Sequence, residues 1–570
     1  MSLNKYVGSQ VDGVSRRGRV ERVITRVIGN DWDTLTPPVL GRWAPRLSVS
    51  VVLPAHGEQR RLDLALASLA VQTYPDDLIE AVVVDDHSAP ALRLPAVRPA
   101  NTRLVRTPDG GHGAGYARAY GAHTSVGEIL LWMDADMVAD PRFIEAQARW
   151  HHAHPECVTL GRVRFADHVP ADPADLLGLV RSGALHHTLD DGRHHAWVER
   201  RLTDTDDLRE ADHLGFHAYV GAAAGLRRGL YEIAGGVDPD LDLGQDTEFG
   251  YRLWQAGAVM LPERAATAWH LGPGETFRTR LPSERFRTNV LAELMPHPHL
   301  YRERVPAERR RVPLVHAVVD ISGAAYDLVR GCVDRLLDSA ETDLLITLVA
   351  DWEGLTAEED GLGELQLGLR LIQANYLRES RIAFASNAPR TAFPSPFLLE
   401  VPVVRGLGQV AVSRMLAGAE RSRAGLTELF PATTATNAPG VRLWRTRALA
   451  RALRAREEGE DIGEVVSALH GRYRIHGGEE ILTDLSLYRS VPPLPRRTPE
   501  PRSGAEGEPP HSATGHDAPA DTHGEVSDPS WEGRRRSPLR RLGAWLGECW
   551  QRVREAHGGG RTDGRGAGER

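Results

Sequence analysis

Two aspartates that follow a hydrophobic run are the residues of this sequence best suited to chemistry. Asp134 and Asp136 follow the run 128–133 and are separated by one residue. Carboxylate oxygens are the ligands that Mg²⁺ and Mn²⁺ prefer when these ions also hold phosphate oxygens. Ligands of α/β proteins bind at the carboxyl ends of strands. The pattern therefore predicts a cation and phosphate site, whereas an isolated Asp-x-Asp also fits a solvated turn.

Two further runs with strand character end in polar residues. Residues 47–53 and 79–84 are rich in valine, and each is a predicted strand. The residues that follow them include Pro54, His56, Glu58, Asp85 and Asp86. Because parallel strands present their carboxyl ends at one edge of a sheet, we expect a nucleotide to lie there with its diphosphate near Asp136. Helix capping is the alternative for Asp85 or Asp86.

The elements that position these strand ends alternate between strand and helix. Helical spacing covers 62–71 and 116–123, and 102–106 is a further predicted strand. Together they predict a doubly wound α/β layer with a mainly parallel sheet. The glycine-rich turn 110–115 lacks both the P-loop ending and the dinucleotide-binding spacing after the first strand, which argues against both of those classes.

Composition limits the class of protein. The 570 residues include 69 Lys and Arg against 77 Asp and Glu, a net charge of −8, so nucleic acid is a poor partner. Cys157, Cys332 and Cys549 are too few and too distant for a disulfide framework, which favours a cytoplasmic protein. We find no secretory signal and no run of about 18 apolar residues, so we expect any membrane contact to be peripheral.

Over residues 48–272 the sequence resembles glycosyltransferase family 2, the inverting nucleotide-sugar transferases with the GT-A fold. The motifs that carry the resemblance are Val51–Pro54, Val84–Ser88, Gly113–Arg118 with Gly121, Gly127–Glu128, Asp134–Asp136, Gly235–Asp238, Gln245–Asp246 with Arg252, and His270. The resemblance implies a Rossmann-like GT-A domain with helices on both faces of its sheet.

The resemblance also implies roles on the donor side. Asp86, with Asp85, is expected near the nucleobase, and Arg118 near the diphosphate or the base. Asp136 becomes the main ligand of Mn²⁺ or Mg²⁺, while Asp134 lies at the ribose or reaches the metal through water. His270 completes the metal shell or touches the diphosphate, with an ordinary core or surface histidine as the alternative. The implied donor-binding residues are Pro54, His56, Glu58, Asp85, Asp86, Arg118 and Asp134, and the implied metal ligands are Asp134, Asp136 and His270.

The segment 243–252 looks like the acceptor-side motif of this family, whose aspartate is the general base. An acceptor hydroxyl must lose its proton as it attacks the anomeric carbon, and a carboxylate within hydrogen-bond reach can take it. Asp246 is the predicted base, with Glu248 as the second candidate and an N-terminal helix cap as the alternative role for Asp246. The implied acceptor-side residues are Gly235, Gly236, Gln245, Glu248 and Arg252.

Some positions depart from the family pattern. Ala55 and His56 replace the usual aromatic residue and asparagine, Ala119 replaces an asparagine, and Gln245 replaces a glutamate. No Gln-x-x-Arg-Trp motif of processive synthases follows the base, which favours transfer of a single sugar. The histidines between 151 and 217 come mostly as adjacent pairs without cysteines, so we predict solvated or acceptor-loop histidines and no zinc site.

After residue 311 the pattern of strand, helix and strand restarts at 314–320, 326–337 and 344–350, followed by Asp351. Residues 441–449 also resemble 223–230, so the second domain is either a diverged copy of the first or an unrelated α/β domain. It has no Asp-x-Asp after a later strand, and we predict that it is not catalytic.

The chain therefore divides into seven predicted parts. They are an N-terminal helix and lead-in (1–46), a GT-A catalytic domain (47–275), a helical linker (276–312), a second α/β domain (313–491), a disordered linker (492–536), an amphipathic helix (537–557) and a disordered tail (558–570). The disorder follows from a composition with almost no aliphatic residues. The amphipathic helix fits either the inner face of a membrane or a protein partner.

Together with the residues at the strand ends, the resemblance implies a metal-dependent enzyme that transfers one sugar, with inversion, from a nucleoside diphosphate sugar to a hydroxyl. The acceptor, whether a glycan, a lipid-linked molecule, a protein or a small molecule, stays open. One rival hypothesis is a non-catalytic scaffold that binds nucleotide sugar and recruits partners at a membrane surface. Another is a sugar-phosphate nucleotidyltransferase, which needs a Gly-x-Gly-Thr-Arg loop that the residues after the first strand do not form.

Overall fold

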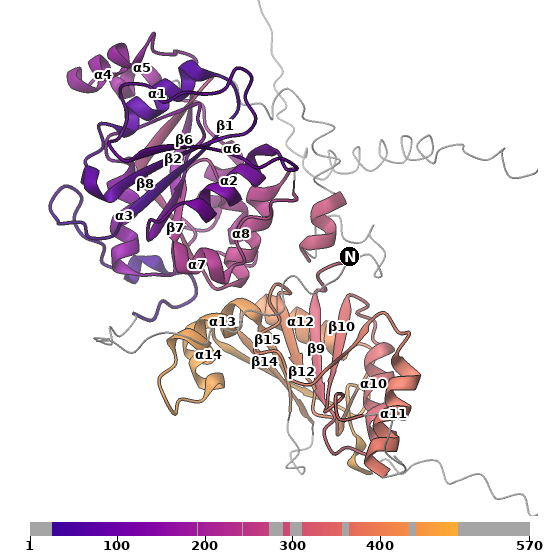
Figure 1. The fold of residues 1–570 in the computed structure, drawn as a ribbon. Helices are drawn as coiled ribbons and strands as arrows, with labels where there is room; N and C mark the ends of the chain where they lie inside the picture. Colours follow the sequence, from indigo (N-terminus) through magenta and orange to yellow (C-terminus); the bar gives the residue numbers. More distant parts are fainter. Residues whose placement is uncertain are drawn as a thin grey trace, which may run out of the picture. The chain divides into compact units, whose positions relative to one another are not determined.

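The computed structural model describes residues 25–190, 192–241, 243–272, 289–296, 310–355, 364–432 and 440–487. These residues contain two α/β domains, each built on one large sheet (Figure 1). The predicted linker 492–536, the amphipathic helix 537–557 and the tail lie outside the described residues, as does most of the predicted N-terminal helix. No helix in the described ranges is both long and apolar enough to cross a bilayer.

The first sheet has eight strands in the order β3-β2-β1-β4-β7-β6-β8-β5. The strands are β1 Val49–Ala55, β2 Ile79–Asp85, β3 Thr102–Arg106, β4 Ile129–Trp132, β5 Met137–Ala139, β6 Cys157–Ala166, β7 Ala224–Arg227 and β8 Val259–Leu271. The four predicted strands are β1 to β4, and they pair in parallel. Antiparallel pairing begins at β7, so the carboxyl ends of β1, β2 and β4 share one edge.

Helices cover both faces of this sheet, as the α/β prediction requires (Figure 1). They are α1 Gln59–Leu69, α2 Gly113–Thr124, α3 Phe143–Ala153, α4 Pro173–Ser182, α5 Leu185–Leu189, α6 Ala196–Asp204, α7 Arg228–Ile233 and α8 Gln245–Gln255. Because side chains alternate along a strand, Val51 and Leu53 pack with α1 and α3, whereas Val52 packs with α2 and α8.

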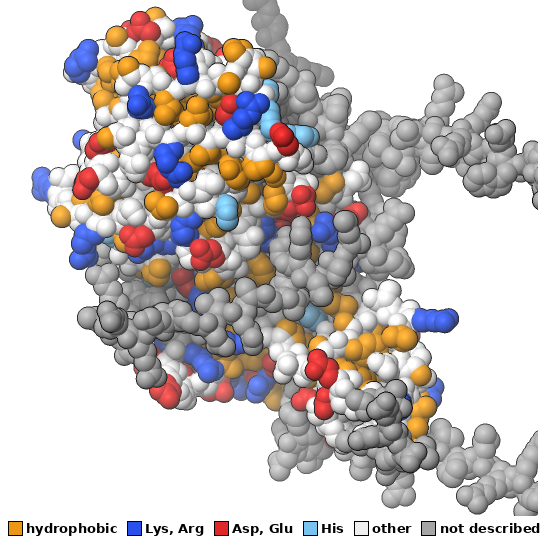
Figure 2. Space-filling view, in the orientation of Figure 1, with side chains coloured by type: hydrophobic (Ala, Val, Ile, Leu, Met, Phe, Trp, Pro, Cys, Tyr) orange, Lys and Arg blue, Asp and Glu red, His pale blue; other side chains and the backbone are white. Residues whose placement is uncertain are grey.

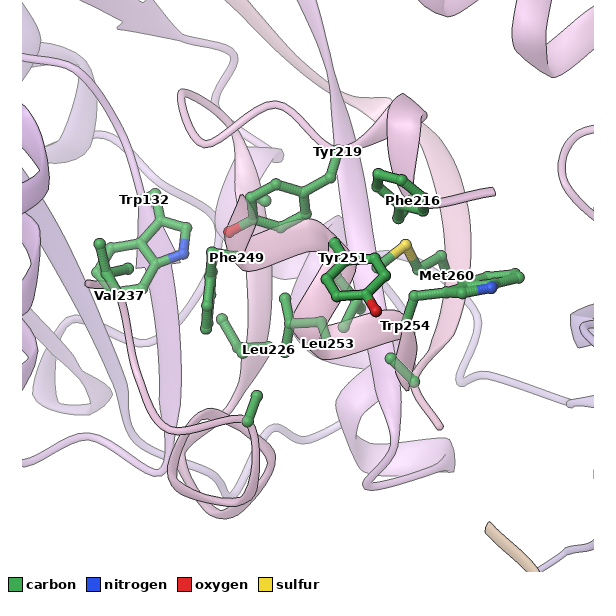
Figure 3. Packing of buried hydrophobic residues seen from close by; sticks show 14 of the residues in the cluster. Trp132, Phe216, Tyr219, Leu226, Val237, Phe249, Tyr251, Leu253, Trp254 and Met260 are labelled. Atoms are coloured by element: carbon green, nitrogen blue, oxygen red, sulfur yellow. The ribbon is translucent and has the colours of Figure 1, made fainter. Parts of the chain in front are cut away.

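The core between the sheet and α8 is rich in aromatic side chains (Figure 3). Phe249 of α8 packs edge-on against Tyr219, with ring centres 5.9 Å apart, and against Tyr231 at 5.6 Å. Tyr231 in turn lies 5.9 Å from Trp132, at the end of β4. Such pairs add about 1 kcal/mol each beyond area burial. They fix the first turns of α8 relative to the end of β4.

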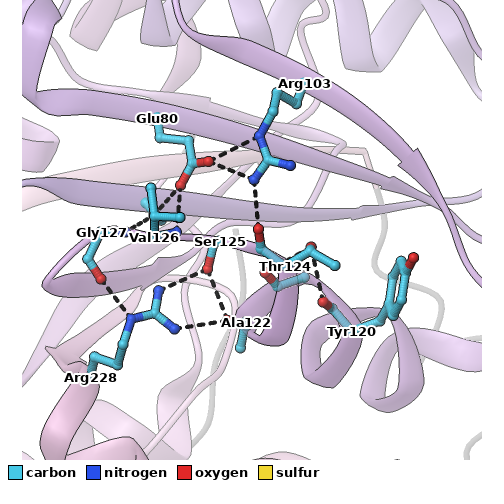
Figure 4. A network of polar contacts seen from close by, with 11 residues as sticks. Glu80, Arg103, Tyr120, Ala122, Thr124, Ser125, Val126, Gly127 and Arg228 are labelled. Atoms are coloured by element: carbon cyan, nitrogen blue, oxygen red, sulfur yellow. Dashed lines mark hydrogen bonds and ion pairs between the residues drawn. The ribbon is translucent and has the colours of Figure 1, made fainter.

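A buried carboxylate joins the strands at the opposite edge (Figure 4). Glu80 accepts hydrogen bonds from the Arg103 guanidinium at 2.6 Å, from the Ser50 hydroxyl at 2.5 Å and from the Val126 amide at 3.0 Å. Burial alone would raise the pKa of Glu80, but these donors hold it below its usual range. The network ties β1, β2 and β3 to the loop that precedes β4.

The surface carries both signs of charge. Figure 2 shows acidic and basic side chains interspersed over the first domain, without a large area of one sign on the face drawn. The face in view therefore shows no extended basic track.

The second sheet repeats the topology of the first. Its order is β11-β10-β9-β12-β15-β14-β16, and each of its six pairings has the same direction as its counterpart in β3-β2-β1-β4-β7-β6-β8. The strands are β9 Val315–Asp320, β10 Leu344–Val349, β11 Ile382–Ala385, β12 Phe397–Glu400, β14 Leu426–Pro431, β15 Val441–Arg445 and β16 Arg472–Gly477. β13 Arg405–Leu407 and β17 Leu482–Asp484 form a small separate sheet. Seven strands in one order favour duplication over an unrelated domain.

The second domain differs from the first at the strand ends. Its helices are α10 Tyr326–Leu337, α11 Glu364–Tyr376, α12 Ala411–Ser422, α13 Thr446–Ala455 and α14 Ile462–His470, so residues 386–396 hold no counterpart of α2. When Val315 is aligned with Val49, the first residues of β9 and β1, the pairings of β12 and β4 make Pro402 and Val404 the counterparts of Asp134 and Asp136. Asp351 corresponds to Asp86 by the same registers. That the second domain is not catalytic stays a prediction.

The described residues belong to one compact unit, within which α13 contacts α8. The Arg447 guanidinium donates to the Ala258 carbonyl and lies 3.6 Å from the centre of the Trp254 ring. Arg454 donates to the Ala256 carbonyl at 2.8 Å. Arg454 satisfies the carbonyl of Ala256, the C-cap of α8, and Arg447 satisfies a carbonyl of the turn between α8 and β8, so the second domain supports the end of the helix that begins at Gln245.

A buried histidine makes the first domain sensitive to acid. His151 of α3 is fully buried beside Thr159, and burial lowers its pKa to about 3. Below the ordinary pKa near 6.5 the unfolded chain binds a proton that the folded chain does not, so stability falls as the pH decreases. We expect this group to remove about 2 kcal/mol of unfolding free energy between pH 7 and pH 5.

Urea unfolding at both pH values, followed by circular dichroism, measures this loss. In His151→Gln, the part of the loss of unfolding free energy that comes from His151 should disappear. His123→Gln, at an exposed site in α2, should lose as much unfolding free energy between the two pH values as the wild type. An unchanged loss in His151→Gln would contradict the assignment.

Candidate donor and acceptor site

The polar residues after β1 and β2 form one connected loop system. The His56 imidazole is 2.6 Å from the Asp86 carbonyl, and the Gly57 amide donates to the Ser88 hydroxyl at 2.8 Å. The Asp85 carboxylate is buried and accepts from the Ser88 amide at 2.9 Å. The predicted nucleobase residues therefore lie together at adjacent strand ends, with Pro54 at the end of β1 and Glu58 exposed just before α1.

Asp86 also connects this loop system to α2. Its Oδ2 accepts from the Gly113 amide at 2.7 Å, and its Oδ1 lies 3.3 Å from the Thr107 hydroxyl. Gly113 is the first residue of α2, so Asp86 satisfies one of the free amides at that helix start. This contact is the capping role that the sequence left as an alternative.

Arg118 brings a donor-side carboxylate and the predicted base together. Its Nη2 donates to Asp134 Oδ1 at 2.6 Å, and its Nη1 donates to Asp246 Oδ1 at 2.9 Å. The arginine comes from α2 and is 4% exposed, whereas the two carboxylates follow β4 and begin α8. Three segments far apart in sequence therefore meet at one guanidinium.

The electrostatics of this triad follow from burial and charge. Burial raises the pKa of Asp134, with Asp136 and Asp246 acting in the same direction and Arg118 opposing them. For Arg118 burial would lower the pKa, but the two aspartates raise it above its ordinary value. Arg118 is thus a permanent cation that partly offsets three neighbouring carboxylates.

Pairing of β5 with β8 places His270 at the Asp-x-Asp turn. Met137 is opposite His270 in this antiparallel ladder, and His270 Nε2 lies 3.1 Å from Asp136 Oδ2. Arg61 of α1 lies 3.6 Å from the same oxygen. Burial would lower the pKa of His270, but the hydrogen bond to Asp136 raises it above its usual value.

The described residues supply only some of the ligands that a divalent cation needs. In the described ranges no group of three or more histidine, cysteine, aspartate or glutamate side chains could by itself hold a metal ion. Asp136 and His270 supply two adjacent donors, while Asp134 is held by Arg118. Mg²⁺ and Mn²⁺ are commonly bound by one or two protein ligands and substrate phosphates, so this pair suits an ion that arrives with a diphosphate.

Comparison with known proteins identifies the first domain. The family model of Glycosyl transferase family 2 matches residues 50–232, which contain β1, β2, β4 and the Asp-x-Asp turn. The chain carries a glycosyltransferase family 2 domain. The resemblance read from the motifs is thereby confirmed for this domain. Asp246 and His270 lie beyond the matched range.

Several curated relatives share sequence with this glycosyltransferase domain and beyond it. A chondroitin synthase of Escherichia coli is 23% identical over 59% of this chain and 50% of its own length. A hyaluronan synthase of Pasteurella multocida is 24% identical over 54% of this chain and 33% of its own. A validoxylamine A glucosyltransferase of Streptomyces hygroscopicus subsp. limoneus is 27% identical over 43% and 54%. The chain thus spans only a third to about half of the length of these relatives.

Close backbone approach shapes the acceptor side of the glycosyltransferase domain. A Cβ on Gly221 would lie 2.2 Å from Asp246 Oδ1, so only glycine lets this loop reach the predicted base. Gly244, directly before α8, has φ +86°, which also suits glycine. The turn at Gly235 and Gly236 follows α7 with positive φ at both residues. Gln245 lies against Gly115 of α2, 3.6 Å from where a Cβ on that glycine would stand.

The two carboxylates of α8 have different surroundings. Both oxygens of Glu248 accept from the Arg252 guanidinium, at 2.5 and 2.7 Å, and both side chains are buried. Asp246 is about one-third exposed and shares Arg118 with Asp134. The geometry therefore favours Asp246 over Glu248 as the base, and gives Glu248 and Arg252 a part in holding α8.

Three side chains near the site carried no recognisable signal in the sequence. Arg61 lies at Asp136, as described above, and Tyr219 lies close enough to Asp246 that the carboxylate adds to the rise that burial causes in the tyrosine pKa. Phe165 of β6 packs between His195, at 5.1 Å, and His270, at 5.6 Å. The sequence shows no spacing that links these residues to the site, because strand pairing brings Phe165 to His270, and Arg61 and Tyr219 reach the site from α1 and from the turn after Gly215–Ala218.

Proposed function

We propose that this protein transfers one sugar from a nucleoside diphosphate sugar to a hydroxyl group, with inversion at the anomeric carbon. The observation that carries the proposal is the bridge of Arg118 between Asp134 and Asp246. Through this bridge a single arginine side chain connects the predicted base Asp246 to Asp134, which follows the strand β4 where the diphosphate is expected. A sugar bound between them would present its anomeric carbon to a hydroxyl held by Asp246.

In the proposed reaction Asp246 accepts the proton of the acceptor hydroxyl. The hydroxyl oxygen forms a bond to the anomeric carbon as the bond from that carbon to the diphosphate oxygen breaks. The electron pair leaves with the nucleoside diphosphate, and no covalent intermediate on the protein is needed. Arg118 orients the Asp246 carboxylate and supplies positive charge beside the departing phosphate.

Asp136 and His270 would hold Mn²⁺ or Mg²⁺, which as a Lewis acid stabilises charge on a departing diphosphate. The pairing of β5 with β8 keeps these two ligands together before the donor binds. Asp85 and Asp86 would contact the nucleobase from the loops after β2.

Transfer of a single sugar is proposed because the motif of processive synthases is missing after Asp246. A cytoplasmic location is proposed from the three distant cysteines, two of which, Cys157 and Cys332, are free and buried.

Calorimetric titration with UDP, GDP and dTDP, with and without Mn²⁺, tests the donor site. One nucleotide should bind in a metal-dependent way, and Asp136→Ala should weaken it by at least about tenfold, as even loss of an outer-shell partner can. Asp167→Ala, an exposed aspartate after β6, is the control and should bind as wild type. If folded wild-type protein binds none of the three nucleotides, the scaffold hypothesis takes first place.

A further inference from the structure

A pocket separate from the nucleotide side opens beside the predicted base. It lies between β6, α6, the segment 218–220 and β8, and holds about 530 Å³ of empty space with its open mouth included. Leu160, Val163, Val198, Leu202 and Val220 give it apolar walls.

Two contacts place the pocket next to the reacting atoms. Val220 of its wall precedes Gly221, which touches Asp246. His195, also in the wall, stacks edge-on with Phe165, and Phe165 contacts His270. Through Val220 and Gly221 the pocket wall therefore adjoins Asp246, near the place where Arg118 holds this carboxylate.

Most charges that line the pocket are already paired. Glu263 accepts from Arg149 and from the Trp150 indole, both at 2.6 Å. Arg264 lies 3.7 Å from Glu199 and 2.6 Å from Asp207. Each carboxylate of the lining thus has its own cation.

Arg162 is the exception among the lining residues that the structure describes. Its Nε is buried without a hydrogen-bond partner, and no carboxylate of the described residues lies within ion-pair distance of it. A buried donor without a partner costs about 1 to 3 kcal/mol, and more when charged. The Nε itself has almost no accessible surface, so a ligand would meet the terminal nitrogens of this guanidinium, and an anionic group there would give the cation the partner that it lacks among the described residues.

Arg162 lies at an irregularity in the pairing of β6 with β8. Gly161 pairs with Glu263, but the next residue, Arg162, pairs with Thr267, so residues 264–266 of β8 have no partner in the ladder. Bulges of this kind redirect side chains and recur beside functional sites. Arg162 lines the pocket directly after this irregularity.

We propose that this pocket binds an acceptor that carries an anionic group, a carboxylate or a phosphate, through Arg162. The apolar walls would contact the carbon face of the acceptor sugar, and its hydroxyl would point to Asp246. A guanidinium suits this task because its planar donors match both carboxylate and phosphate oxygens. This inference rests on the proposed function, since it names the substrate class of the same site.

Binding of three small sugars to the full chain, preloaded with Mn²⁺ and the nucleotide that binds in the donor titration, tests the proposal. The probes are methyl β-glucuronide, glucose 6-phosphate and methyl β-glucoside, and saturation-transfer NMR measures their affinities. At least one anionic sugar should bind about tenfold or more tightly than the neutral one. The first two probes distinguish a carboxylate from a phosphate.

Matched variants connect the preference to the arginine. Arg162→Gln should lower the affinity for the anionic sugar to that for the glucoside, and Arg162→Lys should restore part of the difference. Arg200→Gln, an exposed arginine of α6, should behave as wild type. Unchanged nucleotide affinity in each variant shows that it is folded.

Equal affinity for charged and neutral sugars, no binding of any probe, or a preference that survives in Arg162→Gln would each overturn the proposal. Because the nucleotide titration is read separately, failure here with intact nucleotide binding leaves the proposed sugar transfer standing. Failure of the nucleotide titration itself would remove the proposed function first.

Discussion

Replacing Asp246 by asparagine is expected to lower the turnover number for sugar transfer by about 10²- to 10⁴-fold, the share that a general base commonly contributes. Asparagine has nearly the same shape, so it can keep an oxygen near Arg118, which is 2.9 Å from Asp246 Oδ1 in the wild type. It cannot accept a proton in the transition state. Turnover is measured as release of nucleoside diphosphate in the presence of acceptor.

Glu248→Gln is the matched comparison, because it also replaces a carboxylate by its amide, two residues further along α8. Glu248 is buried in its pair with Arg252, so this variant should lose stability and keep most of the turnover of the molecules that fold. Nucleotide affinity should be close to wild type in Asp246→Asn. A fall in affinity as large as the fall in turnover would show that Asp246 serves the donor and is not the base.

Replacing Arg118 by methionine is expected to abolish measurable transfer and to destabilise the first domain by about 2 to 4 kcal/mol. Methionine fills the volume of the buried stem, but Asp134 and Asp246 lose the cation that they share. Each carboxylate is about one-third exposed, so water repays part of the loss. In the wild type Arg118 opposes the rise that burial causes in the pKa of Asp134, so this pKa should increase further when Arg118 is replaced.

Arg118→Lys separates the charge from the geometry. An ammonium keeps one positive charge but cannot donate in the planar fork that reaches both carboxylates. Urea unfolding should therefore show a smaller loss of stability than in Arg118→Met, while turnover stays at least about a hundredfold below wild type. Wild-type turnover in Arg118→Lys would show that the two-sided bridge is not required.

The donor side of the site could be predicted from the sequence because its residues follow strands directly. A valine-rich run marks a parallel strand, and the position just after it is the carboxyl end of the sheet. Asp85, Asp86 and Asp136 were therefore found from local patterns. What the pattern could not show is that Asp86 also satisfies the first amide of α2.

The relation between the two domains could likewise be predicted only in part from the sequence. The restart of strand, helix and strand after residue 311 suggested a second copy, but a single motif fits many α/β domains. Only the identical order and direction of seven strands favours duplication. Strand order depends on which edges pair across long loops, and residue patterns along one strand do not encode it.

By itself, the sequence determined the α/β class, the family 2 resemblance and the carboxylates at the strand ends, because each depends on residues within a few positions of one another. The tertiary structure alone decided that Arg118 joins Asp134 to Asp246, that His270 meets Asp136, and that Arg162 lines a pocket beside the base. These contacts join residues separated by 16 to 134 positions. They arise from helix packing and strand register, where the free energy of the whole domain, and no local pattern, selects the neighbours.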